Sequence, residues 1–356
     1  MMKIAYGVQG TGNGHITRAR IMAAAFAKRD DVDVDFFFLG RDASHYFDMQ
    51  CFGNYTTFDG LSFITQHGKV SQYQTLRQSK PIQLIRDINS LDLSLYDVVI
   101  NDFEPVTAWA AKRQCVSSIS ISHQASFTQG APKQGAGLVD YLIIRFFAPT
   151  DIQLGVHWFH FGRAILPPFI DEKPIAQAAQ VHTLVYLPFE CIRQITAMLE
   201  PLSEQKFVCF HPQIDNPSVE GHIHWFPTSV TNFKTALQHS SGFIANAGFE
   251  LSSESLQLGK KLLLKPLEGQ FEQLSNASTL RQLSLCEIMY RLDTETVEDW
   301  LQSAAIEPIT FPDDPQILID WFIQRDWTDT QQVCDALWKQ VKFPDHTRDK
   351  LMSLAF

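Results

Sequence analysis

Long apolar runs and positive charge are both scarce in this sequence. No apolar stretch reaches the roughly 18 residues that a membrane span needs, and residues 1–10 (MMKIAYGVQG) lack the apolar core of a signal peptide. Lys and Arg number 29 against 39 Asp and Glu, a formal net charge of -10, whereas nucleic-acid-binding surfaces are densely basic. We therefore expect a cytoplasmic protein without a nucleic-acid partner. Attachment at the inner membrane surface stays open.

Paired cysteines and clustered metal ligands are also lacking. The six cysteines are scattered and none forms a CxxC pair, which favours buried reduced thiols over a disulfide scaffold or a zinc site. Asp31, Asp33 and Asp35 form a D-x-D-x-D run, but they precede or alternate within an apolar strand. We interpret them as a solvated strand start and expect no metal and no cofactor.

Alternating strand and helix patterns fill most of the chain. The length of 356 residues suits two domains, and 45% hydrophobic residues suffice for their cores. We expect a helix at about residues 16–28. Strands are expected at residues 3–8, 34–39, 96–100 and 116–121, and again at 183–187, 206–210, 222–226, 242–245 and 262–265. Nearly continuous apolar strands that alternate with helices are typical of parallel sheets covered by helices.

A proline pair divides this alternation. Pro167 and Pro168 cannot lie inside a regular element, so the neighbourhood of residues 165–170 predicts an interdomain connection. We place the linker at residues 167–172, between an N-terminal domain of residues 1–166 and a C-terminal domain of residues 173–320. Residues 321–356 look helical, and we consider that they cross back to the N-terminal domain.

The first stretch that could bind a ligand or take part in catalysis is Gly7-Val-Gln-Gly-Thr-Gly-Asn-Gly-His15. Its glycines, Gly12 and Gly14 among them, let a ligand approach the backbone at a helix start. The spacing is wrong for the dinucleotide fingerprint GxGxxG, and no acidic residue ends the second strand. His15 opens the helix, where the dipole favours neutral imidazole, a form that can act as a general base. A histidine bonded only to its own loop is the alternative.

Two further stretches lie at strand ends in the second half. In residues 246–259, Gly248 leaves a helix start bare for a diphosphate, and Glu254 lies one turn further in, where it can accept ribose hydroxyls. A solvated face formed by Glu250 and Glu254 is the alternative. In residues 265–277 a Pro-Gly turn leads into a polar helix start. That stretch contains Gln270, Glu272, Gln273 and Asn276, for which loop and helix-cap duty is the alternative.

Together these stretches resemble the GT-B nucleotide-sugar glycosyltransferases, which include the UDP-glycosyltransferases and the enzyme that completes the lipid-linked peptidoglycan precursor. GNGHITRA resembles the GxGHxxPA-type entrance, and NAGFELSSESLQLGKKLLLKPLEGQFEQLSNA resembles the donor-binding signature over about 34 residues. A little-characterised bacterial and archaeal subgroup with GxGHxxRA and DFEP is the nearest pattern. The resemblance implies an α/β GT-B fold, in which two Rossmann-like domains have parallel sheets that face each other across a cleft.

The resemblance also assigns roles. His15 matches the acceptor-side histidine that deprotonates the acceptor in several relatives, and Asp102 the aspartate that orients it. Gly248 and Phe249 match the diphosphate-binding backbone, and Glu254 the ribose-binding acid. Glu272 and Gln273 match the pair facing the donor sugar, and Asn276 the asparagine that ends the motif. We count Gly12, Gly14, Asn246, Glu250 and Gln270 among the donor contacts.

The resemblance therefore implies a hexosyltransferase-type enzyme that moves a sugar from a nucleotide diphosphate, with a UDP-sugar favoured, to a hydroxyl acceptor. A base-assisted displacement without a metal, in which Asp102 or Glu104 helps His15, would invert the anomeric carbon. The acceptor is unidentified, either lipid-linked or a small molecule. The alternatives are a non-catalytic nucleotide-sugar-binding protein and a nucleotide-sugar epimerase on the same fold.

Three departures from the family pattern stand out. Asn246 replaces a phosphate-binding histidine, residues 186–190 (YLPFE) replace a glycine-rich loop, and Arg18 replaces a proline. The most aromatic part of the chain, residues 141–149 and 157–161, suits either ordinary core packing or an apolar patch for an acceptor or for peripheral membrane contact.

Overall fold

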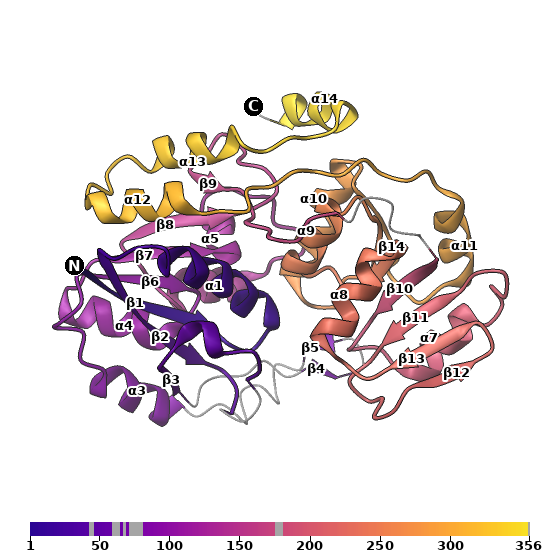
Figure 1. Ribbon diagram of the computed structural model, residues 1–356, viewed down its shortest axis with the longest axis horizontal. Helices are drawn as coiled ribbons and strands as arrows, with labels where there is room; N and C mark the ends of the chain where they lie inside the picture. Colours follow the sequence, from indigo (N-terminus) through magenta and orange to yellow (C-terminus); the bar gives the residue numbers. More distant parts are fainter. Residues whose placement is uncertain (43–45, 59–64, 67–68, 71–80, 175–180, 355–356) are drawn as a thin grey trace.

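A computed structural model describes residues 1–42, 46–58, 65–66, 69–70, 81–174 and 181–354 of the protein, and the statements below concern these residues. Two seven-stranded sheets lie side by side, one in each half of the chain (Figure 1). A two-stranded antiparallel pair, β4 (Thr65–Gln66) and β5 (Lys69–Val70), lies outside both sheets.

The first sheet is parallel throughout, in the order β3-β2-β1-β6-β7-β8-β9. Its strands are β1 (Met2–Gln9), β2 (Val32–Leu39), β3 (Tyr55–Phe58), β6 (Val98–Asp102), β7 (Ser118–Ser122), β8 (Ile152–Val156) and β9 (Ile165–Leu166). All residues of β6 and β7 are buried, as expected for strands that are covered on both faces. The predicted parallel sheet is therefore confirmed.

Helices connect these strands. They are α1 (Asn13–Phe26), the 3₁₀ turn η2 (Gln50–Phe52), α3 (Pro81–Ser90), α4 (Pro105–Gln114), α5 (His123–Thr128) and α6 (Leu138–Phe146). Helix α1 begins three residues before the predicted start and therefore includes Gly14 and His15. Pro105 is the first residue of α4, where its fixed φ and missing N–H cost the helix nothing.

The second sheet has the order β12-β13-β11-β10-β14-β15-β16, and all neighbours except β12 and β13 are parallel. Its strands are β10 (His182–Tyr186), β11 (Phe207–Phe210), β12 (Ser218–Glu220), β13 (Ile223–Phe226), β14 (Ser240–Ala245), β15 (Lys261–Leu264) and β16 (Cys286–Ile288). The helices of this half are α7 (Ile192–Leu199), α8 (Val230–Gln238), α9 (Phe249–Gln257), α10 (Phe271–Gln282) and α11 (Thr294–Gln302). Both halves thus have the predicted α/β architecture.

The segment between the sheets differs in one detail from the prediction. Ile165 and Leu166, which the proline pair suggested as part of a connection, form β9 and pair with Gly155 and Val156 of β8. Both side chains are fully buried, so the edge of the first sheet gains apolar contacts up to the residue before Pro167. Phe169 and Ile170 are also buried and belong to the main core.

The chain then returns to the first half. After α11 it crosses the top of Figure 1, and α12 (Gln316–Gln324) and α13 (Thr330–Trp338) lie along the N-terminal half before α14 (Asp345–Leu354). Helix α12 touches α1, and α13 touches β9, where the indole of Trp338 donates to the carbonyl of Ile165 at 2.6 Å. No helix within the described ranges is long and apolar enough to span a bilayer.

Candidate active site

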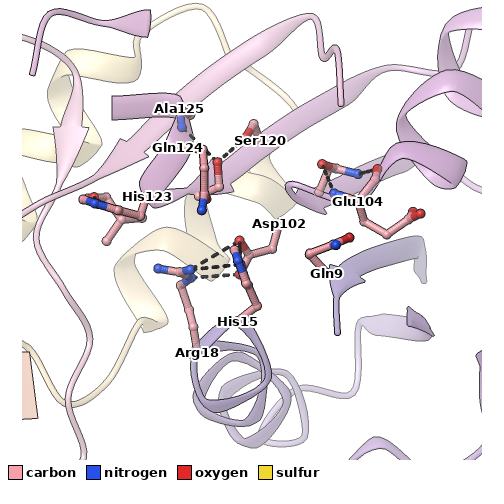
Figure 2. Close-up of polar contacts among 12 residues, drawn as sticks. Gln9, His15, Arg18, Asp102, Glu104, Ser120, His123, Gln124 and Ala125 are labelled. Atoms are coloured by element: carbon pink, nitrogen blue, oxygen red, sulfur yellow. Dashed lines mark hydrogen bonds and ion pairs between the residues drawn. The ribbon is translucent and has the colours of Figure 1, made fainter. Parts of the chain in front are cut away.

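A histidine and an aspartate from different elements meet beside the second half of the molecule. His15 lies in the first turn of α1, and Asp102 is the last residue of β6 (Figure 2). The two side chains are 2.8 Å apart, from Nδ1 of His15 to Oδ1 of Asp102. The side chain of His15 is 15% exposed whereas that of Asp102 is fully buried. This arrangement fixes the ring of His15 and leaves its Nε2 for a proton.

Arg18, one turn after His15, binds the same aspartate. Its Nε donates to Oδ2 of Asp102 at 2.9 Å and its terminal nitrogen to Oδ1 at 3.3 Å, as the dashed lines in Figure 2 show. Burial favours the neutral form of Asp102, but the charges of Arg18 and His15 outweigh it, so the pKa of Asp102 lies below its usual value. Asp102 is therefore an ionised acceptor for the Nδ1–H of His15.

Glu104, which we considered as a second helper of His15, has a structural task instead. Its carboxylate caps α4 by accepting the backbone N–H groups of Val106 and Thr107 and the hydroxyl of Thr107. Burial raises its pKa to about 7, against these hydrogen bonds. Figure 2 shows Glu104 apart from the bonded group of His15, Arg18 and Asp102. That correction leaves Asp102 as the carboxylate bonded to His15.

The start of α9 provides an uncapped helix end. Gly248 is the N-cap residue and has no side-chain hydrogen bond to offer, and a Cβ at this position would meet open space. Phe249 follows with a buried ring. Because Gly248 has no side chain, no N-cap side chain accepts the N–H groups of the first turn of α9. Asn246 donates from Nδ2 to the carbonyl of Lys265 at 2.8 Å, while its buried Oδ1 has no hydrogen-bond partner among the described residues.

The two glutamates of α9 face different surroundings. Glu250 approaches Arg18 of the first half, with 2.7 Å between Oε1 and the guanidinium. Glu254 is 6% exposed, and burial raises its pKa to about 8, opposed by the charge of Lys234. Neither residue forms the solvated helix face that was the alternative interpretation, because both side chains are buried.

The polar residues of α10 contact their surroundings in two ways. Glu272 accepts from the amide of Gln124 at 3.0 Å, and Asn276 donates to the carbonyl of Ala247 at 3.0 Å. Gln273 instead accepts from the backbone N–H of Leu267 at 2.9 Å, so its oxygen stabilises the preceding loop. Gln270 is the N-cap residue of α10 but makes no side-chain cap bond.

Residues that follow β7 and β8 connect the halves, a role that the sequence did not reveal. The ring of His123 stacks on Phe249 with 4.1 Å between centroids, and its Nε2 lies 2.7 Å from Oδ1 of Asn276. The indole of Trp158 donates to the hydroxyl of Ser253 at 2.8 Å. His123 directly follows a buried strand, so its place at a strand's carboxyl end was the available signal. Burial lowers the pKa of His123.

The loop that replaces the glycine-rich segment forms a buried ion pair. Glu190 lies 2.6 Å from Nζ of Lys265, and both side chains are less than 10% exposed. Lys265 follows β15 and Glu190 follows β10, two strands on either side of β14 in the sheet. This departure therefore adds a glutamate, Glu190, that holds Lys265 at the carboxyl edge of the second sheet.

The glycines of the first motif have separate roles. Gly7 lies inside β1, where a Cβ would collide with the side chains of Thr107 and Glu104. Gly12 is the N-cap residue of α1, with open space beside it. A Cβ on Gly14 would lie 2.8 Å from Cγ of Glu250, so α1 and α9 approach each other closely there. The motif thus serves contact between the halves as well as access to the helix start.

The aromatic stretch divides between surface and core. Helix α6 carries large apolar side chains that are about half exposed or more: Leu138, Val139, Tyr141, Leu142 and Phe146. His157, Trp158 and Phe159 are buried. The aspartate run is paired at two positions, Asp31 with Arg29 and Asp35 with Lys3 and Tyr96.

Comparison with known proteins agrees with this geometry. The sequence matches the profile of glycosyl transferase family 1 over residues 2–305. A UDP-glucosyltransferase from Polygonum tinctorium is similar in structure, with a TM-score of 0.61 at 12% identity over 99% of this chain and 98% of that chain. MurG from Acinetobacter baumannii gives 0.53 at 13% identity over 99% of both chains.

A third similar structure is UGT2 of Phytolacca americana, complexed with UDP-2fluoro-glucose and pterostilbene. Its TM-score is 0.58 at 10% identity, with 99% of this chain and 98% of that chain covered. No curated protein sequence matches. At these identities the structural likeness shows the fold, and it confirms the GT-B prediction. The profile match covers most of the chain, and the chain therefore belongs to glycosyl transferase family 1, as a glycosyltransferase with the GT-B fold.

Proposed function

We propose that this glycosyltransferase moves a hexose from a UDP-sugar to a hydroxyl acceptor, inverts the anomeric carbon and uses no metal. The pairing of His15 with the buried, ionised Asp102 carries the proposal, because it prepares an imidazole for proton abstraction. The same roles follow from the resemblance of GNGHITRA to the acceptor-side motif. Three proteins of similar structure are complexed with UDP or with UDP-2fluoro-glucose, which supports the choice of donor.

The proposed reaction is a single displacement. Asp102 accepts the Nδ1–H of His15, so Nε2 takes the proton of the acceptor hydroxyl. The oxygen attacks the anomeric carbon as the bond from that carbon to the diphosphate oxygen breaks. The leaving nucleoside diphosphate gains negative charge, which the free N–H groups at the start of α9 stabilise.

The proposed donor site lies at the carboxyl edge of the second sheet. The backbone of Gly248 to Glu250 would hold the diphosphate, and the buried Glu254 would accept the ribose hydroxyls. Asn246 supports this site, because its buried oxygen has no partner in the described chain. Glu272 and Asn276 would face the sugar, next to His123 and Gln124 of the first half.

Thermal stabilisation by nucleoside diphosphates and nucleotide sugars tests the donor site. A ligand at a hundred times its Kd adds about 2.7 kcal/mol to the free energy of unfolding, a readily measured shift in Tm. UDP compounds should stabilise the wild type and lose most of this effect in Glu254→Ala. Glu287→Ala is the matched control, because Glu287 is exposed on the edge strand β16 of the same sheet. Equal stabilisation of wild type and Glu254→Ala would contradict the assignment.

His15→Ala tests the catalytic role. A general base contributes about 10²–10⁴-fold, so transfer should fall by that factor while UDP still stabilises the variant. Turnover of the donor without any acceptor would favour an epimerase. Nucleotide binding with no turnover in the wild type would favour a non-catalytic binding protein.

Contact with a membrane or a lipid-linked acceptor belongs to the same proposal, and α6 supports it. Leu138, Leu142 and Phe146 are exposed at successive turns, with Lys133 and Arg145 beside the aromatic rings of this helix. The wild type should sediment with vesicles that contain phosphatidylglycerol, and Leu142→Glu should not. Leu95→Glu is the control, since Leu95 is 74% exposed outside α6. Equal sedimentation of both variants would remove α6 from the proposal.

A further inference from the structure

Arg18 contacts both halves of the molecule and has no role in the proposed displacement itself. It lies one turn after His15 on α1, where the resembled motif has proline. Its side chain is 3% exposed and binds Asp102 through two nitrogens, and the third nitrogen lies 2.7 Å from Oε1 of Glu250. Glu250 belongs to α9 of the second half, so Arg18 is a buried ionic contact between the halves.

The four side chains form a row. His15 contacts Asp102, Asp102 contacts Arg18, and Arg18 contacts Glu250, while the guanidinium also lies 3.5 Å from Nδ1 of His15. Among the described residues, three further titratable groups interact with this row. The buried hydroxyl of Tyr6 on β1 is held neutral because burial, and next the charge of Asp102, raise its pKa. His123 interacts with Arg18 and Glu254 with Glu250, and burial lowers the pKa of His123 and raises that of Glu254. Because burial favours the neutral form of all three, the charge of the row is set by two carboxylates and one guanidinium.

The sum of these charges decides how easily His15 takes a proton. With Asp102 and Glu250 ionised and Arg18 charged, the row carries one negative charge, and a proton on His15 neutralises it. Without Glu250, Arg18 already balances Asp102, and a proton on His15 would leave a net positive charge in a largely buried place. Uncompensated buried charge is costly, so Glu250 favours protonation of His15.

We propose that Arg18 is a positioning residue that couples contact between the halves to the strength of the base. It holds Asp102 against His15, and its pairing with Glu250 makes proton uptake by His15 depend on α9 lying against α1. This inference rests on the proposed function, in which His15 is the base. The close approach of Gly14 to Glu250 is consistent with it, because a side chain at residue 14 would separate the two helices.

Glu250 is the partner that Arg18 releases more easily. Burial raises the pKa of Glu250 against the opposing charge of Arg18, whereas the pKa of Asp102 is lowered. Asp102 also receives two hydrogen bonds from Arg18 and lies on the same half as it. When the halves separate, Arg18 therefore stays with Asp102, and the base is left in its weaker state.

Two variants and one control test this coupling in the full chain. Glu250→Gln removes one charge but keeps the backbone N–H that the donor would use. Arg18→Lys keeps the charge but loses the two-pronged contact with Asp102. Lys28→Met is the control, because Lys28 lies in the turn after the same helix and forms an exposed ion pair with Asp314.

In Glu250→Gln, we expect kcat to fall on the order of tenfold and the acidic limb of the pH–rate profile to move to lower pH. The loss in kcat and the shift of the acidic limb should appear even at saturating donor, because the removed charge acts on proton uptake by His15. Lys28→Met should match the wild type. A Glu250→Gln enzyme with wild-type kcat and pH profile would overturn the proposal.

The ¹⁵N NMR signals of the His15 ring, assigned by comparison with His15→Gln, give a readout that needs no substrate. The wild type should show the tautomer with the proton on Nδ1, and Arg18→Lys should lose part of that signature. Unchanged His15 signals in both Arg18→Lys and Glu250→Gln would overturn the proposal. If UDP does not stabilise the wild type, the proposed function fails, and the NMR comparison still decides whether Arg18 positions the dyad.

Discussion

Buried carboxyl groups with opposite pKa shifts mark this site at the scale of single residues. Asp102 is held ionised by Arg18 and His15, whereas burial raises the pKa of Glu254 to about 8. The difference arises from partners rather than from depth, because both side chains are less than 10% exposed. Glu254 has no ion pair within the described chain, so a ligand hydroxyl can approach its carboxyl group without displacing a cation.

Glu254 should make the protein less stable as pH rises. Burial raises its pKa from 4.5 to about 8 in the folded protein, so the folded state binds the proton more tightly than the unfolded state. The free energy of unfolding therefore decreases as pH rises from 4.5 to about 8. Glu254→Gln should remove this slope and be more stable than the wild type at pH 8, by an amount of order 3 kcal/mol. Urea unfolding at pH 5 and pH 8 measures the difference.

Glu104, whose raised pKa lies in the same range, is present in both proteins and cancels from the comparison. An identical pH dependence in wild type and Glu254→Gln would show that Glu254 is ionised in the folded protein at pH 5.

Asn276 holds partners from both halves and should contribute to stability. Its amide donates to the carbonyl of Ala247, and its oxygen lies against His123. Asn276→Ala should cost about 1–3 kcal/mol, because it leaves buried polar groups without partners. Denaturant unfolding checks this, with Gln282→Ala as the control, since Gln282 is exposed at the end of the same helix. A loss no larger than that of the control would contradict the prediction.

At the scale of elements, the starts of α1 and α9 pack closely against each other across the two halves. The absence of a Cβ at Gly14 permits this approach, since Cγ of Glu250 would lie 2.8 Å from it. The two helices carry His15 and the proposed diphosphate site, so their distance bears directly on the reaction. Glycine is used here for space and not for an unusual φ.

Gly14→Ala should push α1 and α9 apart. We expect a loss of about 1–3 kcal/mol in the free energy of unfolding, typical of overpacking, together with a larger radius of gyration. Gly12→Ala is the matched control, because a Cβ at Gly12 meets open space and its φ of -115° suits any residue. Small-angle X-ray scattering and urea unfolding measure the two effects. Equal behaviour of the two variants would exclude steric contact as the role of Gly14.

At the scale of the whole molecule, α12 is packed into the main core beside the N-terminal half. Leu318 and Phe322 of α12 are fully buried in the main cluster, which also contains strand residues from both sheets. Exposed ion pairs join the same surfaces, among them Arg29 with Asp320. Burial of large apolar side chains outweighs such exposed pairs in stability.

Phe322→Ala should therefore destabilise the protein by about 3–5 kcal/mol, the usual cost of removing a buried aromatic ring. Asp320 lies on the same helix as Phe322 and forms an exposed contact with Arg29. Asp320→Ala should therefore cost at most about 1 kcal/mol. Denaturant unfolding compares the two. Similar losses would mean that α12 is held by charge rather than by packing.

The sequence by itself determined the elements and the class of the fold. Periodic apolar residues located most of the strands within a few residues, and the two motifs pointed to the correct family. These features are local, because alternation, glycine spacing and helix starts are set by neighbours in the chain. Even the places of His15 and Asp102 at element ends were readable from their flanking residues.

Beyond the pair of His15 and Asp102, only the tertiary structure decided which side chains meet. The family resemblance paired Asp102 with His15, 87 residues away, whereas nothing in the sequence paired His123 with Asn276, 153 residues away. The contact of Arg18 with Glu250 and the stack of His123 on Phe249 require both halves to be placed side by side. No local pattern encodes that placement, since it follows from how the apolar surfaces of distant segments pack together.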